Sequence, residues 1–122
     1  MKISDVSELF ELIDRTDNMP EDADFCLTLP DDSMAPFFPA GSDVYVSSQR
    51  APAEFDAGIF FYEGKVLCRQ WCEDFSGALH LLPANPALRD ICIIIPKRLR
   101  DKCLCLGSVL SDRKLSRPIY RF

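Results

Sequence analysis

Short apolar runs with a two-residue period dominate the chain after Gly41 and constrain its fold more than any other feature. In "DVYVSS", Val44 and Val46 fall on one face of an extended strand, because successive strand side chains point to opposite faces. Similar runs recur about every 8–12 residues, separated by turn residues, and one further short run precedes Gly41. They are "FCLTL", "IFFY", "KVLCRQWC", "GALHLLPAN", "ICIIIP" and "KCLCLGSVLSD". This pattern predicts a mainly β (α+β) fold, a barrel or sandwich of short strands.

The residues before these strands carry a different pattern. In "SDVSELFELIDR" the apolar residues recur at the spacing of one helix face, and Ser4 or Asp5 can cap such a helix. Residues 14–24 are polar and contain a proline, which indicates a loop or linker. We therefore expect residues 1–24 to form an N-terminal amphipathic helix and a linker, and residues 25–122 to form the β domain.

Length and charge exclude several classes of protein. A chain of 122 residues fits one domain, and none of its apolar runs approaches the about 20 residues of a membrane helix. Acidic residues interrupt the N-terminal apolar positions, so the sequence does not predict a secretory signal. We therefore expect a cytoplasmic location without membrane attachment. The net charge of −5 argues against direct nucleic-acid binding. Residues 65–122 are nevertheless basic and residues 1–64 acidic, which favours internal charge pairing over a basic partner surface.

The six cysteines raise the question of disulfides or metal binding. Disulfides are expected in secreted proteins, and nothing in the sequence indicates secretion. The spacings C-x3-C and C-x-C differ from the usual C-x2-C of zinc sites. Cys68, Cys92, Cys103 and Cys105 lie within apolar runs, where free cysteine behaves as a small hydrophobic residue. We expect buried thiols, no metal and no other cofactor.

The serine of "DDSMAP", Ser33, admits a functional and a structural interpretation. Asp-Asp-Ser before a short helix is a common helix cap, in which a side-chain oxygen accepts from free backbone N–H groups. A serine nucleophile, by contrast, needs a neighbouring base. His80 is the only histidine, and its place on a predicted strand between Leu79 and Leu81 favours a structural role. The other known arrangement is a Ser-Lys dyad, which requires a lysine on a strand facing Ser33.

Four segments together resemble the self-cleaving serine peptidase domain of LexA and of similar phage repressors. They are "DDSMAPFFPAGSDVYV", "AGIFFYEGKVLCRQW", "LHLLPANPAL" and "CLGSVL", in this order within residues 25–110. The resemblance implies a LexA-like, signal-peptidase-like β-barrel or β-clip fold. It aligns Ser33 with the nucleophile of the family's G-D-S-M-x-P motif, and Met34 and Pro36 with the residues after it. Asp32 matches the motif's aspartate, whereas Asp31 stands where the family has glycine.

The same resemblance aligns Arg69, in "VLCRQW", with the family's catalytic lysine. A guanidinium group stays charged even when buried, so it cannot accept the serine proton as a neutral lysine can. We expect Arg69 to donate hydrogen bonds to Ser33 Oγ or to Asp31 or Asp32. Lys65 is a poor replacement, because four residues along a strand separate it from Arg69 by about 13 Å.

Two further features of the family are missing from this sequence. Family members cleave themselves at an Ala-Gly or Cys-Gly bond upstream of the serine, and residues 1–32 contain neither pair. Ala40-Gly41 and Ala57-Gly58 follow the serine and are expected inside the core. The single expected helix is also too little for the helix-turn-helix that precedes the domain in the family.

The resemblance therefore implies a degenerate Ser-Lys dyad in a regulatory or dimerisation module linked to transcriptional repression, of the kind found in the SOS response. Because family members dimerise through this domain, the expected partner is a second copy or a repressor-type protein. Two alternatives remain open. In the first alternative, the chain is an active serine peptidase that acts in trans with another base. In the second, it is an antirepressor-like partner of a full-length repressor.

Overall fold

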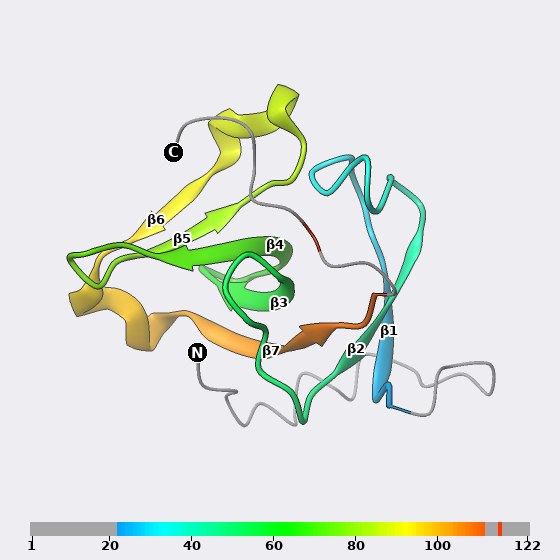
Figure 1. The fold of residues 1–122 in the computed structure, drawn as a ribbon, viewed down its shortest axis with the longest axis horizontal. Helices are drawn as coiled ribbons and strands as arrows, with labels where there is room; N and C mark the ends of the chain where they lie inside the picture. Colours follow the sequence, from blue (N-terminus) through cyan, green and yellow to red (C-terminus); the bar gives the residue numbers. More distant parts are fainter. Residues whose placement is uncertain (1–21, 112–114, 116–122) are drawn as a thin grey trace.

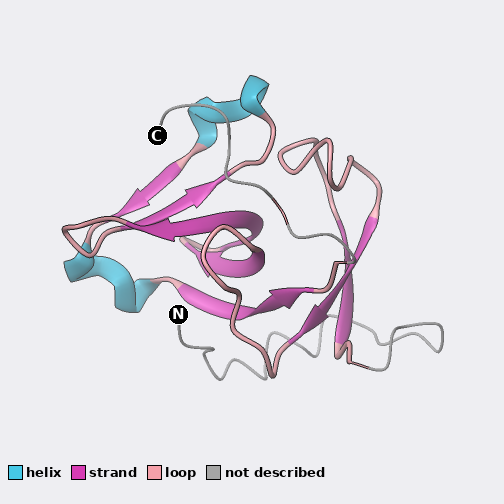
Figure 2. Cartoon of the chain, in the orientation of Figure 1, coloured by secondary structure: helices cyan, strands magenta, loops and turns pink. Residues whose placement is uncertain are grey.

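A computed structural model describes residues 22–111 and Leu115 of the chain (Figure 1). The described residues contain seven strands and two short 3-10 helices, η1 and η2, which flank the sixth strand (Figure 2). The elements are β1 (Phe25–Thr28), β2 (Asp43–Ser47), β3 (Ala57–Tyr62), β4 (Lys65–Glu73), β5 (Leu79–Leu82), η1 (Pro86–Ile91), β6 (Ile93–Ile95), η2 (Lys97–Lys102) and β7 (Leu104–Val109). The helix expected near the N-terminus, in residues 1–24, lies outside the described residues.

All seven strands belong to one antiparallel sheet in the order β1-β2-β7-β3-β4-β5-β6. Within the described residues, the last strand along the chain, β7, is inserted between β2 and β3, and β1 and β6 form the two edges. The mainly β prediction is therefore confirmed. Pairing between β1 and β6, which would close a barrel, does not occur in this part of the chain. None of its helices is long and apolar enough to cross a membrane.

The β3–β4 hairpin forms the centre of the sheet (Figure 1). Its two-residue turn has positive φ at Glu63 (50°) and Gly64 (78°), the backbone of a turn that matches strand twist. The tight "EG" turn predicted from the sequence is thus confirmed. β4 pairs with β3 from Lys65 to Gln70 and with β5 from Gln70 to Glu73. Arg69 lies just before the point where β4 passes from one partner to the other.

Two hydrophobic cores lie on opposite faces of the central strands. On β3, Ile59 packs into the first core and Phe60 into the second, because neighbouring strand residues point to opposite sides. The first core includes Phe25, Met34, Val44, Val46, Cys68, Leu106 and Leu115. The second includes Trp71, Leu79, Leu81, Ile95, Cys103 and Cys105. Burial on both faces explains why β3 reads as a continuous apolar run.

A close backbone approach joins β7 to β2. Gly107 has φ = 152°, and a Cβ built there would lie 2.4 Å from the carbonyl oxygen of Ser47. The β3–β7 register shifts between Ile59 and Phe60, so this glycine lies beside a bulge. Only a residue without a side chain fits at this junction.

Candidate functional site

Ser33 lies in the loop that joins β1 to β2. Backbone hydrogen bonds from Leu29 N to Ser42 O (2.9 Å) and from Gly41 N to Leu29 O (2.8 Å) close this loop at its base. The structural interpretation of Ser33, as the cap of a short helix, is wrong, because no helix follows it in this loop. A turn with one isolated bridge between Met34 and Phe38 takes its place, and the prolines at 36 and 39 disfavour a continuous helix there.

The Arg69 side chain reaches from β4 to the Ser33 hydroxyl. Its Nη1 donates to Ser33 Oγ at 3.0 Å and to the Cys68 carbonyl oxygen at 2.8 Å. Both side chains are buried, with residue exposures of 3% for Ser33 and 6% for Arg69. The structure therefore brings together two residues that are 36 positions apart in the sequence. Lys65 lies exposed at the other end of β4, beside the hairpin turn.

Asp31 completes the polar group around the serine. Its Oδ1 accepts a hydrogen bond from Ser33 N at 3.0 Å, and the Ser33 side chain also bonds to this carboxylate. The side-chain bond contributes most to a lowered pKa of Asp31, followed by the backbone bond, with a smaller contribution from the Arg69 charge. Ser33 Oγ thus accepts a hydrogen bond from the permanently charged Arg69. The carboxylate beside the serine hydroxyl, that of Asp31, is a weak base.

Asn85 holds the serine loop from the other side. Its backbone N donates to Ser33 O (3.1 Å) and its Nδ2 to Asp32 O (3.0 Å), while Asp32 Oδ1 accepts from Ala40 N (2.9 Å). Asn85 belongs to the "LLPAN" segment, which signalled the family resemblance, but it was not predicted as a site residue.

Further predicted residues lie in the same loop and in β3. Met34 is fully buried in the first core and anchors the turn, whereas Pro36 is exposed. Ala40 and Gly41 are also exposed, so the prediction that this Ala-Gly pair lies in the core is wrong. Ala57-Gly58, in β3, is buried as expected.

Comparison with known protein families identifies the domain. The model of the family described as Peptidase S24-like matches residues 2–110. This chain belongs to the Peptidase S24-like family. The S24-like domain is of the type found at the C-terminus of LexA and phage repressors. No curated protein matches the chain.

The thiol of Cys68, the residue next to Arg69 in the site, is unreactive. Burial raises the pKa of Cys68 to about 12, although the neighbouring Arg69 charge acts in the opposite direction. A neutral thiol next to a cation is neither a ready nucleophile nor a base. All six cysteines are free. Cys103 and Cys105 are buried as predicted, while Cys92 is only partly buried. No group of three or more potential metal ligands occurs among residues 22–111.

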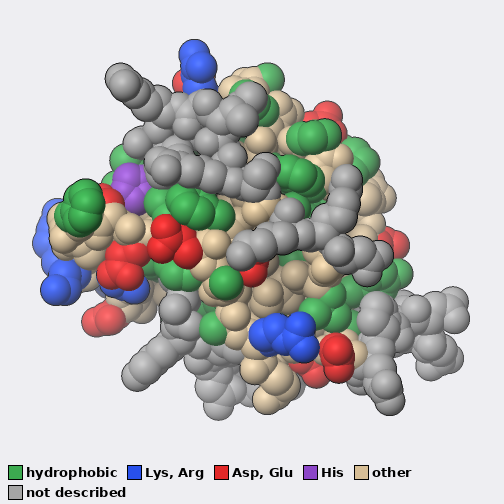
Figure 3. Space-filling view, viewed as in Figure 1, with side chains coloured by type: hydrophobic (Ala, Val, Ile, Leu, Met, Phe, Trp, Pro, Cys, Tyr) green, Lys and Arg blue, Asp and Glu red, His purple; other side chains and the backbone are tan. Residues whose placement is uncertain are grey.

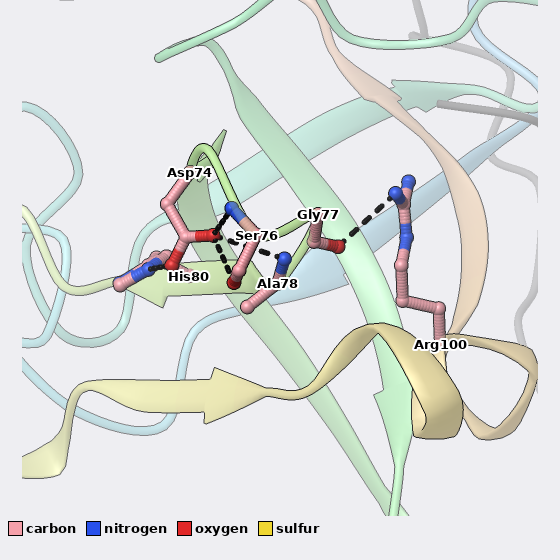
Figure 4. Close-up of polar contacts among 6 residues, drawn as sticks. All are labelled: Asp74, Ser76, Gly77, Ala78, His80 and Arg100. Carbon is pink, nitrogen blue, oxygen red and sulfur yellow. Dashed lines mark hydrogen bonds and ion pairs between the residues drawn. The ribbon is translucent and has the colours of Figure 1, made fainter.

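His80 belongs to a separate polar cluster at the β4–β5 turn of the S24-like domain (Figure 4). Its Nε2 lies 2.8 Å from Asp74 Oδ2, while Asp74 Oδ1 accepts from Ser76 N, Ser76 Oγ and Ala78 N. Arg100, from η2, donates to Gly77 O and to Glu73. Figure 3 shows the purple His80 among acidic and apolar side chains at this end. Its contacts support the structural role expected from the sequence.

The Asp74 cluster gives a pH prediction for stability. Hydrogen bonds from Ser76 and His80 hold the pKa of Asp74 well below its usual range. The stabilisation is therefore fully present above the unfolded pKa of about 3.9 and is lost as pH falls through the folded pKa. Asp74→Asn should lower the thermal midpoint at neutral pH, and its difference from wild type should shrink below pH ~4. Thermal melts from pH 2 to 7 measure this. A difference independent of pH would contradict it.

Proposed function

We propose that this chain is a LexA-like S24 domain that does not cleave peptide bonds and acts as a regulatory or dimerisation module linked to transcriptional repression. The β-clip or barrel arrangement of LexA, with one N-terminal helix, is part of this proposal. So is a cytoplasmic setting, in which free cysteines stay reduced. The observation that carries the proposal is the buried hydrogen bond from Arg69 Nη1 to Ser33 Oγ.

Arg69 supports a non-cleaving domain because of the chemistry that a guanidinium group can and cannot perform. Its positive charge can stabilise an anion that forms on Ser33, but it has no lone pair to accept the hydroxyl proton. Loss of a general base typically costs about 10²–10⁴-fold in rate. The same side chain fills the position beside the serine, so a base from elsewhere has little access to Oγ.

The alternative, a working peptidase with another base, has one candidate in the described residues. Asp31 is the carboxylate bonded to Ser33, but its lowered pKa makes it a poor proton acceptor at neutral pH. His80 is engaged with Asp74 at the β4–β5 turn, and Lys65 is exposed at the β3–β4 turn. These placements favour the non-cleaving function.

The proposed partner is a second copy of the chain or a repressor-type protein. In the antirepressor-like form of the proposal, the domain pairs with a full-length repressor and changes its dimerisation. Direct contact with nucleic acid is not part of the function, in agreement with the net charge of −5.

Comparison of the wild-type chain with Ser33→Ala tests the proposal. Each protein is incubated with a peptide that contains an Ala-Gly bond, from neutral to alkaline pH, and the products are counted by mass spectrometry. Equal background rates are expected, because Ser33 has no base. Cleavage that is faster in wild type and disappears in Ser33→Ala would establish the active-peptidase alternative.

A further inference from the structure

The Asp31 carboxylate is hydrogen-bonded to the backbone and to the side chain of Ser33. Its Oδ1 accepts a hydrogen bond from Ser33 N at 3.0 Å, and the serine side chain bonds to the same carboxylate. The carboxylate therefore lies within hydrogen-bond distance of both the serine hydroxyl and the serine N–H group. Ser33 is buried, whereas Asp31 is exposed, so the carboxylate is the member of this group that meets solvent.

A peptide substrate would need the same place beside Ser33. When a serine attacks a peptide bond, the carbonyl carbon lies against Oγ, and the carbonyl oxygen becomes an anion that nearby N–H groups stabilise. The N–H of the attacking serine is one of these donors in the best-studied serine peptidases. In this chain that N–H already donates to Asp31 Oδ1. The negative charge of the carboxylate would also repel the developing anion.

Asn85 fixes the direction of this N–H group. Its Nδ2 donates to Asp32 O at 3.0 Å, and its backbone N donates to Ser33 O at 3.1 Å. Asp32 O and Ser33 N belong to one planar peptide group, so holding the oxygen also orients the N–H. The bonds from Asn85 do not involve Asp31. We therefore expect the N–H group to keep its direction when the Asp31 carboxylate is removed.

We propose that Asp31 is a built-in inhibitor of the serine site, whose carboxylate occupies the position that the carbonyl oxygen of a peptide substrate would take. The inference rests on the non-cleaving function proposed above and adds a second block, independent of the missing base. Arg69 supplies the compensating charge, because its Nη1 lies 3.0 Å from Ser33 Oγ and its charge acts on the Asp31 carboxylate. Without Asp31, Arg69 and the Ser33 N–H should together favour an anion that a ligand supplies.

A peptide boronic acid tests this position without requiring cleavage. When Ser33 Oγ bonds to its boron, the boron becomes tetrahedral and negatively charged, and the hydroxyl proton passes to solvent. No bond to boron breaks, and nothing is oxidised or reduced. The probe is a short peptide whose C-terminal alanine carries a boronic acid in place of the carboxyl group. Calorimetry on the full chain measures its dissociation constant, and boron NMR detects the tetrahedral adduct.

Wild type should bind the boronic acid weakly, and Asp31→Gly should bind it about tenfold more tightly or better, because two negative charges no longer meet. Asp31→Asn should show a smaller gain, since an asparagine oxygen can still accept from Ser33 N. Ser33→Ala in the Asp31→Gly background should lose both the gain and the tetrahedral boron signal. Circular dichroism should show that each variant folds.

Asp32→Asn is the matched control. Asp32 is also an exposed acidic residue of this loop, but its Oδ1 accepts from Ala40 N at 2.9 Å. Its replacement should leave the dissociation constant of the boronic acid unchanged. An equal gain in Asp32→Asn would overturn the inhibitor role, because any nearby negative charge would then act alike.

Two other results would also overturn it. One is equal binding by wild type and Asp31→Gly, and the other is a gain in Asp31→Gly that survives Ser33→Ala. Both leave the non-cleaving function intact, because they do not depend on hydrolysis. A wild-type chain that cleaves the Ala-Gly peptide through Ser33 would instead overturn the non-cleaving function and the inhibitor role together.

Discussion

Arg69→Lys should convert the chain into a measurable peptidase, with cleavage of an Ala-Gly peptide in trans rising about 10²–10⁴-fold above the wild-type background. The arginine Nη1 is already 3.0 Å from Ser33 Oγ in a buried site, so a lysine amine there is within reach of the hydroxyl. Burial lowers the pKa of a lysine amine, and the neutral amine can then take the serine proton. Rates measured by mass spectrometry across pH 7–10.5 test this expectation.

The neighbouring carboxylate predicts the pH dependence of that variant. Asp31 stabilises a protonated lysine, so activity of Arg69→Lys should appear at alkaline pH. Adding Asp31→Gly, the residue that the family carries at this position, removes the charge and should move the pH profile towards neutral. Ser33→Ala in the Arg69→Lys background should abolish the gain. A wild type that cuts as fast as Arg69→Lys would disprove the idea that the arginine blocks catalysis.

Gly107→Ala should cause the largest loss of stability of any single methyl addition at a described glycine. Its Cβ would lie 2.4 Å from Ser47 O and 2.9 Å from Ser47 C, and backbone atoms in paired strands cannot move aside. The φ of 152° adds strain for any residue with a side chain. We expect the free energy of unfolding to fall by about 2–4 kcal/mol or more, measured by urea denaturation.

Gly64→Ala provides the matched control for this substitution. Gly64 also has positive φ (78°), but nothing lies within 4 Å of a Cβ built there. It should therefore show only the cost of a left-handed alanine, about 1 kcal/mol. Equal losses at both positions would mean that backbone conformation, and not the contact with Ser47, makes Gly107 necessary.

The sequence predicted the strands well and their arrangement poorly, for a physical reason. Alternation of apolar residues is local, so the β3–β4 hairpin could be recognised with its turn at Glu63 and Gly64. The insertion of β7 between β2 and β3 depends on contacts between distant residues, which no local pattern carries. The 3-10 helices η1 and η2 also went unpredicted, because such short turns have no periodicity of their own.

For a related reason, the sequence predicted some residues of the candidate site and missed others. Family motifs alone suggested that Ser33 and Arg69 would lie together, and the structure brings them into hydrogen-bond contact. The interpretation of Ser33 as the cap of a short helix was wrong, because the Asp31 side chain instead accepts a hydrogen bond from the Ser33 backbone N–H within a turn. Asn85 was missed because its role is to hold backbone atoms of another loop, and the residue type alone does not reveal that.

The position of β7 has a consequence for synthesis on the ribosome. The strands that border β7, β2 and β3, are made early, yet their shared neighbour consists of residues Leu104–Val109. Until that segment has left the exit tunnel, the nascent chain exposes two unfilled strand edges in the middle of its future sheet. Such edges readily pair with other chains. The growing polypeptide is therefore most exposed to misassembly while β2 and β3 have emerged and β7 has not.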